Sequence, residues 1–187
     1  MPGELPRSIT VNGIDYKIRT DRRDILKIIK AFNDPELEDE DKVFVCLFIL
    51  YKRFYDIPKK DYEEAFTAAL KFMDFGIETD EHARTLPRTM DWEQDEGILY
   101  PAINKVAGYE TRNAKYIHWW TFAGYFMEIA DGVFATILNL RLKKAKGKRL
   151  DKTEREFWNA NKGICVLKTK LSKEEQEEKD RLNALLG

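Results

Sequence analysis

The sequence predicts a mainly α-helical protein: a multi-helix bundle with a small β-hairpin at its N-terminus. Two observations predict this fold class. In several stretches, apolar residues recur every three or four positions, which is the spacing of one buried helix face. Near the start, the pair Asn12-Gly13 lies between two short stretches of alternating polarity, which is typical of a hairpin. With 187 residues, the chain is long enough to bury a core.

The hairpin is expected to pair residues 8–11 with residues 14–18. Asparagine and glycine readily adopt the positive backbone angles that a two-residue turn requires. Ile14, Tyr16 and Ile18 alternate with polar residues. We therefore expect one face of the hairpin to lie on the helices.

The first helix is expected directly after the hairpin. Thr20 or Asp21 can cap its start, and Ile25 and Ile28 begin a buried face at helical spacing. Pro35 should end it, because proline cannot continue a helix.

Residues 43–51 are almost continuously apolar and, taken alone, could also form a buried strand. Acidic residues at 36–41 precede this segment and Lys52-Arg53 follows it, an order of charges that suits the dipole of a helix. We therefore predict a helix, buried within the bundle because it is apolar all round. A third helix is expected after Pro58, with a left-handed stop at Gly76.

Residues 78–90 are polar and are predicted to form a loop, which at this length is typical of a contact segment. Asp91-Trp92-Glu93-Gln94 resembles a capping box and should start a helix that Gly108 ends. The spacing then predicts one long aromatic helix from Trp119 to about Leu142. Its tryptophans and phenylalanines make it the expected centre of the core.

The composition changes after Leu142, where residues 141–149 form a basic stretch. We therefore predict two parts: a helical domain with the hairpin, residues 1–145, and a C-terminal helical extension, residues 146–187.

The extension is expected to contain two capped helices. Asp151 starts a short one that Gly163 ends, and Ser172 caps a highly charged final helix. Only three leucines on the final helix are apolar, so it has little to bury and should be available to a partner.

No pattern in the sequence predicts a catalytic, cofactor-binding or metal site, and we expect a protein that is not an enzyme. The two histidines, His82 and His118, lack the neighbouring ligands of a zinc site, and His118 is expected in the core or at a helix start. Four acids cluster at one expected helix start: Asp91, Glu93, Asp95 and Glu96. They could hold magnesium or act as acid and base, but a helix N-terminus favours acids in any case.

Charge and cysteine usage narrow the class of protein. The net charge of −1 gives no general attraction to nucleic acid or membranes, and no apolar run is long enough to span a bilayer. Residues 141–149 have no interleaved aromatics for base stacking, which favours a solvated face or a protein contact over nucleic acid. Cys46 and Cys165 are expected as buried free thiols in a soluble, intracellular protein.

Several segments resemble the gene-product-fifteen (Gp15) family of tailed-phage proteins. They are Leu5-Pro6, Ile18-Arg19-Thr20-Asp21-Arg22-Arg23, Asp91-Trp92-Glu93-Gln94-Asp95-Glu96-Gly97-Ile98-Leu99-Tyr100, Ile117-His118-Trp119-Trp120-Thr121-Phe122 and Ile137-Leu138-Asn139-Leu140-Arg141. The most specific is the His-Trp-Trp element, where Ile117 replaces the leucine typical of the family. The resemblance spans Leu5 to about Trp158, and the final helix matches less clearly.

The resemblance implies a mostly helical tail-assembly chaperone of long-tailed phages that acts in the host cytoplasm. It would coat the tape-measure protein, help recruit tail-tube subunits and leave before the virion matures. The implied partners are the tape-measure protein and the tail-tube protein, with self-association as a further expectation; the family brings no catalytic residues. The contact surfaces would be the final helix, the basic stretch and the loop at residues 78–90. Alternatives are a minor structural protein of the virion, at the tail or head–tail junction, and a nucleic-acid binder.

Overall fold

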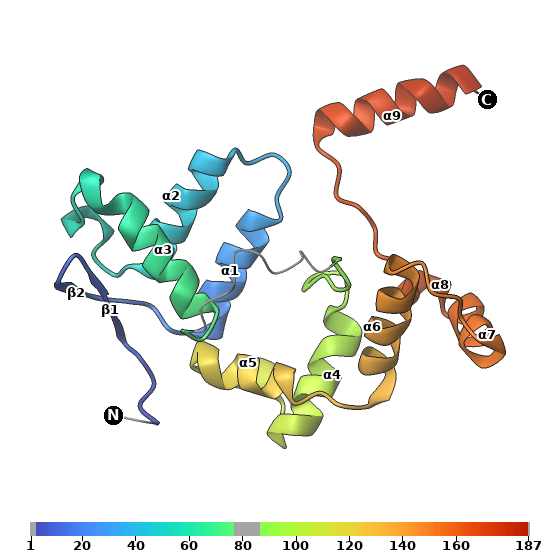
Figure 1. Ribbon diagram of the computed structural model, residues 1–187, viewed down its shortest axis with the longest axis horizontal. Coiled ribbons are helices and arrows are strands. Elements are labelled where there is room, and N and C mark those ends of the chain that lie inside the picture. The colour runs from blue at the N-terminus through green and yellow to red at the C-terminus, as the bar shows by residue number, and fades with distance from the viewer. Residues whose placement is uncertain (1–2, 77–86, 187) are drawn as a thin grey trace. The chain divides into compact units, whose positions relative to one another are not determined.

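The computed structural model describes residues 3–76 and 87–186 and shows a mainly α-helical protein with an N-terminal hairpin, which confirms the predicted fold class (Figure 1). The elements are β1 (Ser8–Val11), β2 (Ile14–Lys17), α1 (Arg22–Phe32), α2 (Asp39–Leu50), the 3-10 turns η1 (Phe54–Asp56) and η2 (Lys59–Asp61), α3 (Tyr62–Met73), α4 (Glu96–Ala107), η3 (Thr111–Asn113), α5 (Trp119–Met127), α6 (Gly132–Ala145), α7 (Lys152–Ala160), α8 (Lys162–Cys165) and α9 (Lys173–Leu186).

The chain forms two compact units. Unit 1 comprises Met1–Asp74 and Thr169–Gly187, and unit 2 comprises Phe75–Lys168. The change of composition after Leu142 lies inside unit 2. The predicted boundary between residues 145 and 146 therefore follows the change of composition. The two domains 1–145 and 146–187 stay a prediction.

The hairpin of unit 1 forms at the predicted turn. Asn12 and Gly13 both have positive φ, 46° and 80°, as a two-residue turn of this kind requires, and β1 and β2 pair antiparallel. The expected inward face is correct at Ile18, which is buried, but wrong at Ile14, whose side chain is 53% exposed. Ile14 follows the turn directly, so it lies at the free end of the hairpin, beyond the core.

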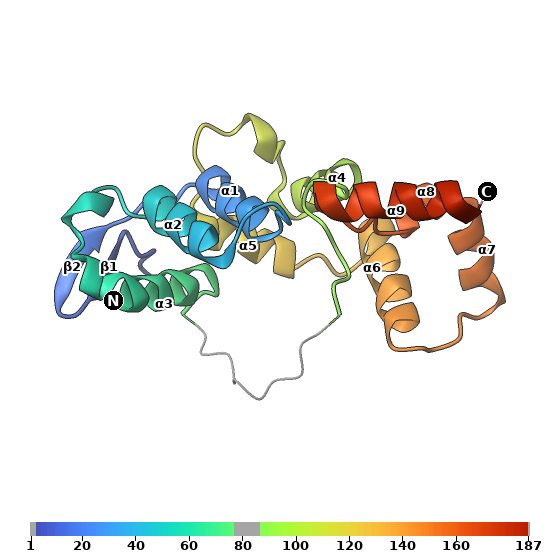
Figure 2. The same cartoon turned by 90° about the horizontal axis from the view of Figure 1, so that it is seen from above.

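Helices α1, α2 and α3 pack together in unit 1, with the hairpin against α3, as both views show (Figures 1 and 2). Asp21 caps α1 by accepting a hydrogen bond from the Arg23 backbone N–H at 2.9 Å, which confirms the predicted start. The Tyr51 hydroxyl donates to the carbonyl of Ala65 at 2.8 Å and joins the end of α2 to α3. The buried apolar residues of these elements include Val11, Ile18, Ile25, Ile28, Cys46, Leu47, Leu50, Tyr51, Ala65, Ala69 and Phe72.

The core of unit 2 is aromatic and centred on α5, as predicted. The Trp119 ring stacks on Phe75, with ring centroids 6.2 Å apart, and packs against Trp92 at 6.4 Å. His118 is the N-cap of α5: its Nδ1 accepts a hydrogen bond from the Trp120 backbone N–H at 3.1 Å. His118 is 3% exposed, so its predicted place at a buried helix start is confirmed.

The single helix expected from Trp119 to Leu142 is wrong. Helix α5 ends at Met127, α6 begins at Gly132, and the two are bent by 75°. Asp131 is fully extended, and Gly132 has φ of 92°, a conformation that no other residue type adopts readily. Apolar spacing continues across this break, which is why periodicity alone did not reveal it. In the described part of the chain no single helix could cross a membrane, and α5 with α6 meets the length and composition criterion only as a bent pair.

The other helix ends of unit 2 differ from expectation by a few residues. Asp91 to Asp95 form a turn, and α4 begins at Glu96. It ends at Ala107, and the Gly108 that caps it is left-handed as predicted. The capping box of Asp151 and Glu154 starts α7, but this helix ends at Ala160. Gly163 lies within α8 instead.

Candidate functional site

Arg141 of the basic stretch and Asp95 of the acidic cluster form a buried ion pair in unit 2. The Arg141 guanidinium donates to both carboxylate oxygens of Asp95, at 2.7 and 2.8 Å, and the two side chains are 4% and 2% exposed. The same guanidinium donates to the backbone carbonyls of Thr89, Ile164 and Cys165, so it joins α6 to α8 and to the segment before α4. This pair is enclosed by the fold and acts as a structural link.

The predictions for these two residues are therefore corrected. Arg141 is not part of a basic surface, because it lies four residues after Ile137 on the buried face of α6. Asp95 lies four residues before Leu99 on the buried face of α4, and its partner is a cation rather than the helix dipole alone.

The remaining acids of the expected cluster do not converge. One oxygen of Asp91 accepts from the backbone N–H groups of Glu93 and Gln94, at 2.9 and 2.8 Å, so this side chain organises the turn before α4. Glu93 and Glu96 are exposed. Within residues 3–76 and 87–186, no three His, Cys, Asp or Glu side chains come together as a metal site would require. His82 and most of the loop predicted at 78–90 lie outside the described residues.

A surface that sequence reasoning missed lies on α2 and η1 of unit 1. The aromatic patch consists of Phe44, Phe48 and Tyr55, whose side chains are 49%, 46% and 80% exposed. The Phe44 and Phe48 rings stack with centroids 5.8 Å apart, and Tyr55 lies 6.4 Å from Phe48. The buried Phe54 ring lies beneath them, 5.4 Å from Phe44 and 6.1 Å from Phe48.

The phase of α2 explains why this patch faces outward. Cys46, Leu47 and Leu50 lie on one side of the helix and are fully buried, whereas Phe44 and Phe48, one turn apart, lie on another side. The prediction that α2 is buried on all sides is therefore wrong. The sequence did contain a signal of this face. Two phenylalanines are four residues apart, and on a helix they fall on a different side from the buried residues.

Neighbouring groups hold the end of α2 and shape the edge of the patch. The Arg19 guanidinium donates to the carbonyls of Ile49 and Tyr51, at 2.7 and 3.1 Å, where the helix ends. Phe48 and Tyr55 line an open cavity of about 280 Å³, together with Arg19, Tyr51, Lys52, Arg53, Phe54 and Asp56. Exposed apolar groups beside a charged rim are typical of a surface that binds another polypeptide.

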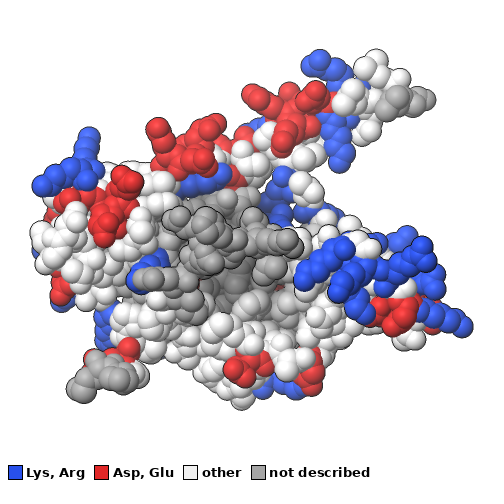
Figure 3. All heavy atoms as spheres, viewed as in Figure 1, with Lys and Arg blue, Asp and Glu red and all other residues white. Residues whose placement is uncertain are grey.

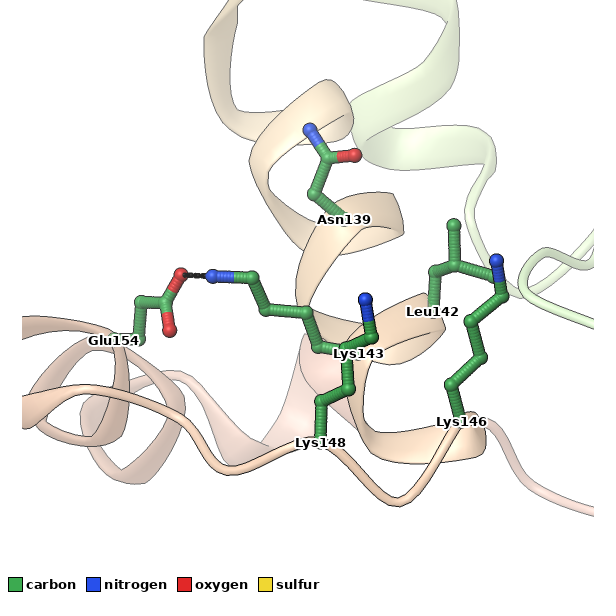
Figure 4. A pocket seen from close by; sticks show the side chains of 6 residues that line it. All are labelled: Asn139, Leu142, Lys143, Lys146, Lys148 and Glu154. Atoms are coloured by element: carbon green, nitrogen blue, oxygen red, sulfur yellow. Dashed lines mark hydrogen bonds and ion pairs between the residues drawn. The ribbon is translucent and has the colours of Figure 1, made fainter.

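The predicted basic stretch forms a basic pocket of about 380 Å³ at the end of α6, lined by Asn139, Leu142, Lys143, Lys146, Lys148 and Glu154 (Figure 4). Gly147, with φ of 68°, reverses the chain, and the Lys148 N–H donates to the Lys143 carbonyl at 2.8 Å. This turn brings Lys148 back beside the last turn of α6, where Lys146 is the C-cap. The Lys143 ammonium bonds Glu154, which raises the pKa of Lys143. Basic side chains gather over α6 and α7 in the space-filling view (Figure 3).

The predicted contact helix, α9, exposes every side chain that is described. The capping box is present: Ser172 Oγ accepts from the Glu175 N–H at 3.1 Å, and the Glu175 carboxylate accepts from the Ser172 N–H at 2.8 Å. Leu182 and Leu185 are 52% and 76% exposed, so the expectation that this helix has little to bury holds for the described residues. Acidic residues gather on its first half (Figure 3).

Comparison with known families agrees with the segments quoted from the sequence. The family described as Bacteriophage Gp15 protein matches residues 1–167, which include every element from β1 to α8 and exclude α9. No curated protein and no solved structure matches the chain. Because the family match covers most of the sequence, the chain belongs to the Bacteriophage Gp15 protein family, and this membership indicates a phage structural or assembly protein.

Proposed function

We propose that the protein is a non-catalytic tail-assembly chaperone that binds the tape-measure protein in the host cytoplasm and helps recruit tail-tube subunits. The aromatic patch is the observation that carries this proposal. Large aromatic side chains that stay exposed in a folded unit are costly to leave in water and are enriched where proteins bind each other. Membership of a phage structural or assembly family supports a phage protein as the partner.

The geometry of the patch suits a helical client. Phe44 and Phe48 are one helical turn apart and stack into a short ridge, with Tyr55 beside it. Apolar residues on a client helix recur at the same spacing, so successive turns can pack along the ridge. A long helical client would present many such segments, and a chaperone that coats it needs a repeated contact of this kind.

Binding of a co-expressed tape-measure protein tests the proposal. The variant F44S/F48S/Y55S should bind at least about tenfold more weakly, because the anchor side chains of an interface carry most of its binding energy. A matched control is Y109S/M127S, which removes two other exposed apolar side chains, 45% and 59% exposed, from unit 2. The control should bind like the wild type.

Two outcomes would contradict the proposal in different ways. If the wild-type protein does not bind the tape-measure protein, the proposed chaperone function is wrong. If the wild type and F44S/F48S/Y55S bind equally well, the aromatic patch is not the surface that binds the tape-measure protein. Mass spectrometry of purified virions distinguishes the alternative of a minor structural protein, which would be present in the particles, from a chaperone, which would be absent.

A further inference from the structure

We propose that the basic pocket of one copy binds the acidic first half of α9 from a second copy, so that the protein associates head to tail. The aromatic patch shares no residue with the pocket or with α9. The inference therefore stands apart from the proposed function.

The basic pocket carries a concentrated and available positive charge. Residues 143–149 include five cations and no acid. Lys143 is engaged by Glu154, and the Lys144 ammonium lies 4.3 Å from the centre of the Trp158 ring. Among the described residues, Lys146, Lys148 and Arg149 have no acidic partner. Figure 4 shows both lysine side chains of this group lining the pocket beside Leu142.

The first half of α9 carries the opposite charge. Residues 174–178 include four glutamates and no cation. Glu174, Glu177 and Glu178 lie on one face, since residues three and four apart are neighbours on a helix surface. All three are exposed, and within the part of the chain that the structure describes none has a cationic partner. Three unpaired carboxylates on a preformed helix thus match the unpaired Lys146 and Lys148 of the pocket and the unpaired Arg149 that follows them in the sequence.

A polypeptide fits this pocket better than a nucleic acid does. Binding to single strands uses aromatic faces on which bases stack, and none of the six residues that line this pocket is aromatic. The Trp158 ring of α7 has the Lys144 ammonium over one face. The lining also includes the apolar side chain of Leu142, for which a phosphodiester chain offers no apolar partner. Lysine side chains beside an apolar residue are instead complementary to an acidic helix, whose glutamates present both methylene groups and carboxylates.

The interface would join two different surfaces, because the pocket and α9 are separate parts of the chain. Such a heterologous contact leaves one free pocket and one free helix on every pair of copies, and further copies can add. Pairs of exposed charges are weak and strongly screened. Association should therefore be reversible and should depend on both protein concentration and salt.

Sedimentation velocity over a range of protein concentrations tests this inference. At about 50 mM salt the average mass of the wild type should rise with concentration, and at about 500 mM salt it should fall back to that of one chain, since screening then acts within about 3–5 Å. The variants K146E/K148E and E174K/E178K should each associate at least about tenfold more weakly. The four-site variant that combines them restores opposite charges and should regain association.

Two controls accompany these variants. K59E/K60E reverses two exposed lysines of η2 and should associate like the wild type. Circular dichroism should be unchanged in every variant, because all the substituted side chains lie at the surface. A mass that does not change with concentration at low salt, or a four-site variant that fails to associate, would overturn the inference. So would self-association that survives K146E/K148E while salt-dependent binding of single-stranded DNA is lost, which would assign the pocket to nucleic acid.

Discussion

The buried end of α6 and the exposed face of α2 both have a burial that the composition of the surrounding sequence does not indicate, and they differ from it in opposite directions. Arg141 belongs to a run of cations yet is buried, and it forms an ion pair with Asp95. Phe44 and Phe48 belong to the most apolar run of the chain yet are about half exposed. In both helices the position on the helix surface decides burial, and the composition of the surrounding run does not.

The two cases also differ in energetic consequence. A buried charge is stable only while its partner and its hydrogen bonds are in place, so its loss affects folding. An exposed aromatic side chain gains little from folding, so its loss should affect binding. Variants of the two regions should therefore separate an effect on stability from an effect on binding.

Arg141→Ala should lower the free energy of unfolding of unit 2 by about 3–5 kcal/mol, because it leaves the Asp95 carboxylate buried without a cation. Three backbone carbonyls lose their donor as well. Urea unfolding followed by tryptophan fluorescence measures this loss, since all four tryptophans lie in unit 2.

The control for this prediction is Arg149→Ala, which removes an exposed arginine of the same basic stretch. It should change the free energy of unfolding by less than about 0.5 kcal/mol. If the two variants lose the same stability, the pair of Arg141 and Asp95 does not hold unit 2 together.

Cys46 and a cysteine placed at position 48 should react with iodoacetamide at different rates, because the two positions lie on different faces of α2. Burial raises the pKa of the Cys46 thiol to about 12, so it stays protonated at pH 8.5 and should not react with iodoacetamide in the native state. A cysteine at the exposed position, in Phe48→Cys, should react at least about 100-fold faster. Peptide mass spectrometry after timed labelling measures the rate at both sites. Comparable rates would show that Cys46 and position 48 do not lie on a buried and an exposed face of α2.

The same thiol makes the stability of unit 1 depend on pH. Folding raises the pKa of Cys46 above its ordinary value of 9.0, so the unfolded chain loses this proton first as the pH rises. The stabilisation is complete below pH 9 and should be lost progressively between about pH 9 and pH 12. Cys46→Ala should show a smaller fall over this range, in unfolding followed by circular dichroism.

The break between α5 and α6 determines which side of α6 faces the core. Gly132→Ala should lower the free energy of unfolding of unit 2 by about 1–2 kcal/mol, because its φ of 92° is strained for any residue with a Cβ. Nothing lies within 4 Å of the added Cβ, so backbone strain is the only cost. Gly124→Ala, inside α5 and equally open, should stabilise by about 0.5–1 kcal/mol. Effects of the same sign would contradict the break.

Local signals in the sequence were sufficient for the fold class. Asn12-Gly13 predicted the hairpin turn, Asp21, Asp151 and Ser172 predicted helix starts, and Gly108 predicted a helix end. Each of these depends on backbone angles or on a hydrogen bond to a residue nearby, so it needs no knowledge of tertiary structure.

Features that depend on distant partners were missed. The pairing of Arg141 with Asp95 joins residues 46 positions apart, and nothing near either residue indicates it. The helix break at Asp131-Gly132 was hidden because apolar spacing continues across it. The outward face of Phe44 and Phe48 depends on which side of α2 meets α1 and α3.

Loss of the aromatic patch should affect stability only slightly. F44S/F48S/Y55S should change the free energy of unfolding of unit 1 by less than about 1 kcal/mol, since these side chains are already about half exposed or more in the folded state. Phe54→Ser, directly beneath the patch and 4% exposed, should cost about 3–5 kcal/mol. Unfolding of both variants is followed by circular dichroism. A large loss in the triple variant would mean that the three rings are part of the core, and weaker client binding could then reflect unfolding rather than a lost contact.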